Sequence, residues 1–67
     1  MTVSSVSAIT ATSSLSWQDA LESGFKRARK TLRGIQAIEV VAERVRVEKG
    51  EIKYYEVDLK VIFTLDD

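Results

Sequence analysis

Acidic side chains are the residues of this sequence best placed to do chemistry. Glu39 and Glu43 are separated by an even number of positions, as are Glu56 and Asp58, so on extended strands each pair shares one face. When the two strands pair, we expect Glu43 to lie directly opposite Glu56, where like charges repel. Hard cations such as calcium bind several carboxylate oxygens. Glu43, Glu56 and Asp58 are therefore candidate metal ligands.

The same carboxylates have an alternative interpretation that needs no ligand. Basic residues lie on the same two segments, namely Arg44, Arg46, Lys53 and Lys60. Ion pairs within the subunit or across an interface would then neutralise the acidic groups. The sequence leaves both interpretations open.

The composition excludes several classes of chemistry. The chain has no cysteine and no histidine, so it lacks thiolates, disulfides and the usual general base, and we expect no enzymatic activity. Lys plus Arg number 10, as do Asp plus Glu, whereas nucleic-acid-binding proteins normally carry a basic excess. No apolar run approaches the ~20 residues of a membrane span, and the start does not resemble a signal peptide. We expect a cytoplasmic protein without nucleic-acid or membrane partners.

The length predicts a single domain over residues 1–67 and, with it, self-assembly. A domain this short buries only about 60% of the surface that its unfolded chain exposes. Such domains are usually stabilised by disulfides, a structural metal or oligomerisation. Because cysteine and histidine are absent, a homo-oligomer is the expected solution.

The first half of the chain predicts a strand followed by a helix. Residues 3–11 mix threonine and serine with valine and isoleucine, which is typical of an edge strand. Ser16 followed by Asp19 fits a helix start. We predict a helix over 17–33, ended by Gly34. Its apolar stripe consists of Leu21, Phe25, Ala28 and Leu32.

The second half predicts a hairpin, with strands at 35–48 and 51–65 joined by Lys49-Gly50. A three-residue loop would turn the carboxylates of the first strand into the core, which is costly, so we favour a two-residue loop. That loop gives the pairs Glu48–Glu51, Ala42–Val57, Val40–Leu59 and Ile38–Val61.

The hairpin has two faces, and the single helix can cover only one. The helix is expected to cover the odd-numbered residues of the last strand, from Tyr55 to Leu65. Most residues of the opposite face are nevertheless apolar or aromatic, so a partner subunit, or a ligand held between subunits, is expected to cover it. We call this opposite side the outer face, and its predicted members are Ala37, Glu39, Val41, Glu43, Val45, Val47, Ile52, Tyr54, Glu56, Asp58, Lys60 and Ile62.

Several segments, in this order and spacing, resemble a known family. They are SSLSWQDAL, RARKTLR, the pair Glu39-Val40 and KYYEVDLKVIFTLDD. From Val3 to Asp66 the chain is similar to the dodecin family. The resemblance implies an α+β fold with a β-α-β-β subunit, whose three-stranded antiparallel sheet wraps around one helix. It also implies a hollow homo-dodecamer that binds flavins in pairs between subunits, on the sheet face turned away from the helix.

The resemblance implies a ligand site at Ala37, Glu39, Glu56 and Asp58, with two departures. Flavin-binding members carry a stacking tryptophan at the position of Ala37 and a glutamine at that of Glu56. An alanine cannot supply a stacking contribution of about 0.5–1.5 kcal/mol, and an ionised glutamate donates no hydrogen bond. Trp17 lies at the helix start and is expected to anchor the helix or a subunit contact instead.

The predicted function is therefore non-catalytic binding and storage of a small molecule, with riboflavin or FMN implied by the resemblance. The alternative is a structural or calcium-binding dodecameric shell that binds no flavin. Some family members that lack the tryptophan are described as calcium-binding.

Overall fold

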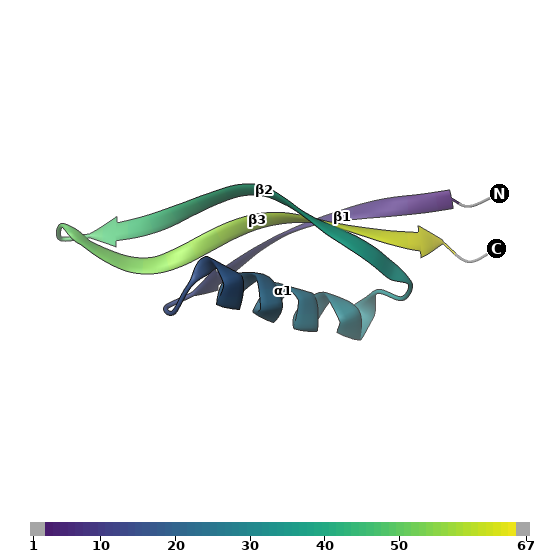
Figure 1. The fold of residues 1–67 in the computed structure, drawn as a ribbon, viewed down its shortest axis with the longest axis horizontal. Helices are drawn as coiled ribbons and strands as arrows, with labels where there is room; N and C mark the ends of the chain where they lie inside the picture. Colours follow the sequence, from purple (N-terminus) through teal and green to yellow (C-terminus); the bar gives the residue numbers. More distant parts are fainter. Residues whose placement is uncertain (1–2, 66–67) are drawn as a thin grey trace.

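A computed structural model describes residues 3–65. The elements follow in the order β1 (Val3–Ser13), α1 (Trp17–Thr31), β2 (Ile35–Glu48) and β3 (Glu51–Leu65). The strands form one three-stranded antiparallel sheet in the order β1-β3-β2. The helix lies along one face of this sheet (Figure 1). The predicted β-α-β-β architecture is confirmed.

Strand β1 occupies one edge of the sheet, as its polar composition predicts. It pairs with β3 without interruption, from Val3 opposite Leu65 to Ser13 opposite Tyr55. From Ser5 onward its side chains alternate between half-buried and exposed, as expected for a strand covered on one side. The strand ends two residues later than predicted.

The start of α1 is fixed by side chains on both sides of the turn. The Oγ of Ser16, the N-cap residue, accepts a hydrogen bond of 2.9 Å from the amide of Asp19, which confirms the predicted cap. The Oγ of Ser13 donates to Oδ2 of Asp19 at 2.6 Å. This second bond joins the end of β1 to the first turn of the helix.

The end of α1 differs from the prediction. The helix stops at Thr31, because Leu32 is already extended, with φ −109° and ψ 136°. Gly34 has φ +68°, and its carbonyl accepts a hydrogen bond from the amide of Thr64 at 3.0 Å. Gly34 therefore forms the turn that leads into β2, and it does not end the helix.

The helix packs on the sheet through small residues. On the sheet side, the fully buried residues Val57, Leu59 and Val61 all belong to β3. The helix lies close to the sheet at Gly24, where an added Cβ would be 3.1 Å from both Ala11 Cβ and Leu59 Cδ1. Of the predicted stripe, Leu21 packs against this core, but Phe25 is 37% exposed and lies beside the guanidinium of Arg29. The larger apolar side chains therefore flank the contact. The small buried residues are Ala20, Gly24 and Ala28.

The hairpin tip has the predicted two-residue loop, with φ 51° at Lys49 and 76° at Gly50. Positive φ at both positions is typical of a tight hairpin turn. The predicted pairs Glu48–Glu51, Val40–Leu59 and Ile38–Val61 are confirmed.

Between these pairs the register of the hairpin shifts. A bulge between Val40 and Ala42 places Ala42 opposite Asp58, so the predicted pairing of Ala42 with Val57 is wrong. An extra residue moves the side chains that follow it to the other face of the strand, and a second shift between Arg46 and Val47 restores the predicted register toward the hairpin tip. Glu43 consequently lies opposite Val57, and Arg44 lies opposite Glu56.

Because of this bulge, the composition of the outer face differs from the prediction. The predicted opposition of Glu43 and Glu56 is wrong, and an arginine faces Glu56 instead. Repulsion between like charges is thereby replaced by attraction. In this part of β2 the outer-face residues are Ala42, Arg44 and Arg46.

The helix leaves the outer face of the sheet uncovered, and the hairpin tip projects beyond the helix start (Figure 1). Several apolar residues are consequently exposed, among them Val6 and Val41 at 55% each. Within residues 3–65, no helix has the length and apolarity needed to cross a membrane.

Candidate functional site

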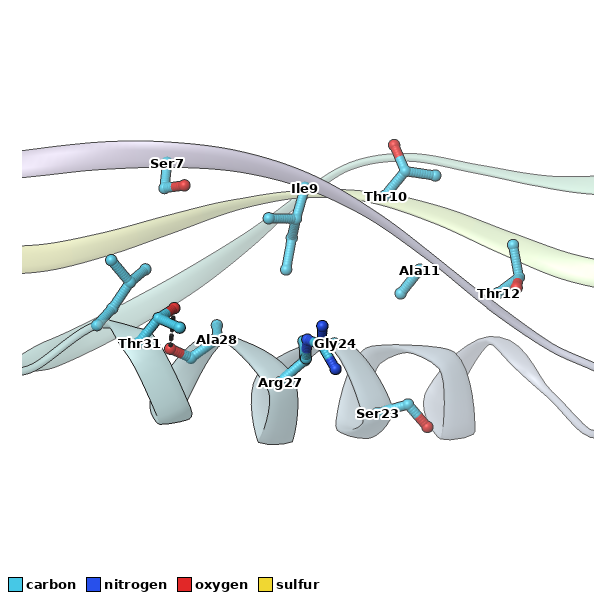
Figure 2. Close-up of a pocket in the computed structure, with 11 residues that line it drawn as sticks. Ser7, Ile9, Thr10, Ala11, Thr12, Ser23, Gly24, Arg27, Ala28 and Thr31 are labelled. Carbon is cyan, nitrogen blue, oxygen red and sulfur yellow. Dashed lines mark hydrogen bonds between the residues drawn. The ribbon is translucent and has the colours of Figure 1, made fainter.

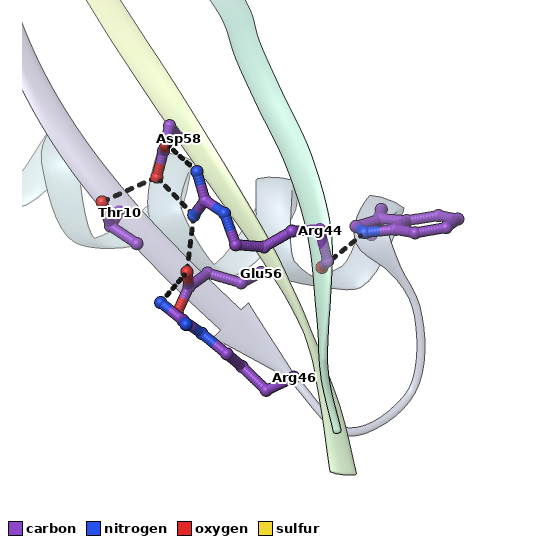
Figure 3. A network of polar contacts seen from close by, with 6 residues as sticks. Thr10, Arg44, Arg46, Glu56 and Asp58 are labelled. Carbon is purple, nitrogen blue, oxygen red and sulfur yellow. Dashed lines mark hydrogen bonds and ion pairs between the residues drawn. The ribbon is translucent and has the colours of Figure 1, made fainter. Parts of the chain in front are cut away.

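A network of polar side chains crosses the outer face, with Arg44 at its centre (Figure 3). Nη1 of Arg44 donates to Glu56 Oε2 at 2.5 Å and to Asp58 Oδ1 at 3.1 Å, and Nη2 donates to Asp58 Oδ2. Thr10 Oγ1 donates to Asp58 Oδ1 at 3.0 Å. The network joins side chains from all strands of the sheet.

Arg46 completes the network from further along β2. Its Nη2 donates to Glu56 Oε2 at 3.0 Å and its Nε to Glu56 Oε1 at 3.4 Å. Both carboxylate oxygens of Glu56 therefore accept from guanidinium groups, and this side chain is only 9% exposed. The side chain of Arg46 is 54% exposed.

The arginines stabilise the charged forms of the acidic groups. Hydrogen bonds from Arg44, and then from Arg46, lower the pKa of Glu56 below its ordinary value. Hydrogen bonds from Arg44, and then from Thr10, lower the pKa of Asp58. The same contacts raise the pKa of Arg44. All of these groups are consequently charged at neutral pH.

The predicted site residues do not all come together within one chain. Glu56 and Asp58 lie in the network, but Ala37 lies opposite Ile62 and Glu39 opposite Lys60. Ile62 is separated from Glu56 by six positions of β3, a distance of about 20 Å at the rise of an extended strand. Ala37 and Glu56 of a single chain are therefore too far apart to contact one small ring.

The geometry does not support the predicted metal site. Glu43 lies opposite Val57, away from the other two proposed ligands, whose oxygens accept hydrogen bonds from Arg44 and Arg46. Among residues 3–65, no group of three or more histidine, cysteine, aspartate or glutamate side chains is arranged to hold a metal ion. For Glu56 and Asp58, the alternative interpretation as ion pairs is confirmed.

Thr10 was missed from the sequence as a contributor to this site, and the bond from Trp17 to Arg44 was not foreseen. Thr10 comes from the edge strand and carries no local signal beyond its strand propensity. Trp17 was correctly expected to anchor, and its Nε1 donates to the carbonyl of Arg44 at 3.1 Å. Its ring meets that of Tyr55 edge to face, with centroids 5.2 Å apart. Only the fold brings these residues to Arg44.

The outer face is hollowed beside the network. A shallow cavity of about 340 Å³ is bordered by Thr10 and Asp58 of the network, and by Ala8, Val41 and Lys60. A ligand seated here would lie on apolar side chains with charged groups at its margin.

A second cavity, of about 430 Å³, lies between β1 and α1 on the other side of the sheet. Its apolar floor includes Ile9, Gly24 and Ala28, and Arg27 stands at its rim (Figure 2). Thr31 Oγ1 donates to the carbonyl of Ala28 at 3.4 Å. This cavity contains none of the predicted site residues.

Comparisons with known proteins agree with the fold. Residues 3–66 match the family model described as Dodecin. A dodecin from Streptomyces davaonensis is 33% identical, with a TM-score of 0.91 over 98% of this chain and 97% of that chain. A protein from Thermus thermophilus is 31% identical, with a TM-score of 0.93 over 100% and 98%. A dodecin from Streptomyces coelicolor is 29% identical, with a TM-score of 0.92 over 98% and 94%. No curated protein matched in a sequence search.

Proposed function

The chain belongs to the dodecin family, and from this premise we propose that it binds and stores a small ligand without catalysis. The ligand is a flavin, riboflavin or FMN, held between subunits of a homo-dodecamer. The absence of histidine and cysteine supports a role without proton-transfer or thiol chemistry.

The observation that carries this proposal is the uncovered outer face. Val6 and Val41 are each 55% exposed there, and a cavity of about 340 Å³ lies beside a polar network. Contiguous apolar surface next to convergent polar groups is characteristic of binding sites. The helix cannot cover this face, because it lies on the opposite one.

The separation of Ala37 from Glu56 supports a site shared between copies. Both positions belong to the flavin site that family resemblance implies, yet about 20 Å of strand separates them within one chain. A ring that contacts both positions must receive them from different subunits. A ligand site that is incomplete in one chain fits a protein that works as an oligomer.

Native mass spectrometry of untreated protein tests the proposal, since it reports the stoichiometry and the bound molecule together. We expect twelve subunits and, after addition of riboflavin or FMN, added mass and quenched flavin fluorescence at micromolar concentrations. A stable, folded monomer in dilute solution would contradict the assembly. A dodecamer that quenches neither flavin would contradict the ligand assignment.

A further inference from the structure

We propose that the guanidinium of Arg46 is the group that contacts the hydrogen-bonding edge of the ligand, and that the ligand presents acceptor atoms there. The site then selects a planar ring with carbonyl or anionic oxygens on its edge, in preference to a cationic or donor-rich ring. This inference rests on the proposed function, because Arg46 holds Glu56, a position of the flavin site that the family resemblance implies.

Glu56 is not accessible to a ligand. Its Oε2 accepts from Nη1 of Arg44 at 2.5 Å and from Nη2 of Arg46 at 3.0 Å, and its Oε1 accepts from Nε of Arg46 at 3.4 Å. The side chain is 9% exposed. A carboxylate with both oxygens engaged and almost no exposed surface holds its neighbours in place and leaves the ligand contact to them.

Arg44 is also committed. Its Nη1 donates to Glu56 and Asp58, and its Nη2 donates to Asp58. The hydroxyl of Thr10 is directed to Asp58 as well. These groups form the rigid part of the network, in which Arg44 uses three of its five N–H donors.

Arg46 differs from Arg44 in how far its guanidinium is open to a ligand. It uses Nε and Nη2 for Glu56, whereas in the described part of the chain its Nη1 has no hydrogen-bond partner. Its side chain is 54% exposed, against 35% for that of Arg44. Glu56 thus holds the guanidinium in a fixed plane, with one edge and its flat face open to a ligand.

The chemistry of this group defines the ligand class. A guanidinium has donors and no acceptor, and its flat face stacks on aromatic rings. The most exposed charge of the network is positive, because Glu56 is buried beneath the arginines. Carbonyl or anionic oxygens are attracted there, whereas a cationic ring is repelled. Arg46 thereby supplies the donor that an ionised glutamate cannot.

The test is a titration of riboflavin against the assembled protein, followed by fluorescence quenching. Arg46→Met keeps the length of the side chain but removes its donors, and we expect about a tenfold weaker affinity, the effect of one hydrogen bond to a charged group. Lys53→Met is the matched control, because it removes an exposed cation of the neighbouring strand that pairs only with Glu48, at 3.6 Å. Its affinity should stay within about twofold of wild type.

The class of ligand is tested with proflavine, a planar cation of similar size. We expect wild-type protein to bind riboflavin more tightly than proflavine, and Arg46→Met to reduce that preference. Tighter binding of proflavine to wild-type protein would overturn the assignment of the ligand class.

The outcomes separate this inference from the proposed function. Wild-type affinity in an assembled Arg46→Met variant overturns the role of Arg46 and leaves flavin storage standing. Failure of wild-type protein to bind riboflavin or FMN overturns both. If Arg46→Met does not assemble, the Arg46→Lys variant tests the role of Arg46 in its place. A lysine keeps the charge but cannot hold Glu56 side-on, so riboflavin affinity should fall about threefold, and unchanged affinity overturns the inference.

Discussion

The indole of Trp17, at the start of α1, donates from Nε1 to the main-chain carbonyl of Arg44 in β2 at 3.1 Å. This bond joins the covered side of the subunit to the strand segment whose side chain organises the outer face. The ring of Trp17 also packs edge to face on Tyr55, at an interplanar angle of 76°. The position of Arg44 is thus fixed from both faces of the sheet.

Loss of the indole N–H should loosen this link. Trp17→Phe keeps an aromatic ring beside Tyr55 but removes the donor, so we expect the free energy of unfolding to fall by about 1 kcal/mol. Trp17→Ala also removes the ring and should lower the free energy of unfolding further. Chemical denaturation followed by circular dichroism measures both. Equal stability of wild type and Trp17→Phe would show that the bond contributes nothing.

A methyl group at Gly24 should be destabilising, although alanine favours helices by about 1 kcal/mol over glycine. The new Cβ would lie 3.1 Å from Ala11 Cβ and from Leu59 Cδ1. Overpacking of this kind costs about 1–3 kcal/mol, and Ala11 cannot rotate its Cβ away. We expect Gly24→Ala to lower the melting temperature, and the added change Ala11→Gly to restore part of it. The exposed Ser23→Ala is the control, and an unchanged or higher melting temperature of Gly24→Ala would refute the close approach.

Acid should weaken the folded state through Glu56 and Asp58. Their arginine contacts lower the folded pKa of each below its ordinary value of 4.5 or 3.8, so the unfolded chain binds more protons in this range. The stabilisation is present above about pH 4.5 and is lost as pH falls through the folded pKa values. Denaturation at several pH values should show that acid lowers the free energy of unfolding less in Glu56→Gln than in wild type. Glu48→Gln, which changes an exposed carboxylate, should behave like wild type, and identical acid profiles for all three proteins would contradict the role of Glu56.

A tryptophan at position 37 should strengthen flavin binding. Ala37 is exposed, and the family resemblance implies a stacking ring at its position, a contact that contributes about 0.5–1.5 kcal/mol. Ala37→Trp should therefore tighten riboflavin binding about three- to tenfold, as measured by fluorescence quenching. The double variant Ala37→Trp with Glu56→Gln tests both departures from the family together. If that variant assembles but does not bind flavin, the site is wrongly placed.

Calcium and chelator should leave thermal stability unchanged. The oxygens of Glu56 and Asp58 already accept hydrogen bonds from arginines, and Glu43 lies opposite Val57, away from them. A cation would have to displace guanidinium groups to bind. Thermal melts with millimolar calcium or with EDTA should therefore coincide, and a calcium-dependent rise of several degrees would restore the ion-binding alternative.

Much of the fold was predictable because its signals are local. Ser16 and Asp19 lie three residues apart and form the predicted cap, and Lys49-Gly50 forms the predicted turn. The helix end was less predictable, since Gly34 has the backbone of a C-terminal cap but serves the entry into β2. A positive φ is required in both cases, so the residue type does not distinguish them.

The candidate site was less predictable because it depends on two register shifts, a bulge between Val40 and Ala42 and a second shift between Arg46 and Val47. Nothing in the residues around Val41 marks an extra residue, and an uninterrupted strand would bring Glu43 opposite Glu56. The bulge substitutes Arg44 at that place and converts a predicted cation site into an ion-pair network. The helix contact was also misjudged, since the hydrophobic stripe includes Phe25, which is 37% exposed, and omits Gly24, which is buried against Ala11 and Leu59.

The strand order has a consequence for how the protein is made. Within residues 3–65, strands β1 and β2 each pair only with β3, the last of the three in the chain. During translation neither has its partner until residues 51–65 have left the ribosome, so the sheet cannot close before synthesis of those residues is finished. A chain that stops short of β3 therefore has no sheet on which its helix can pack, and it cannot contribute a subunit to an assembly.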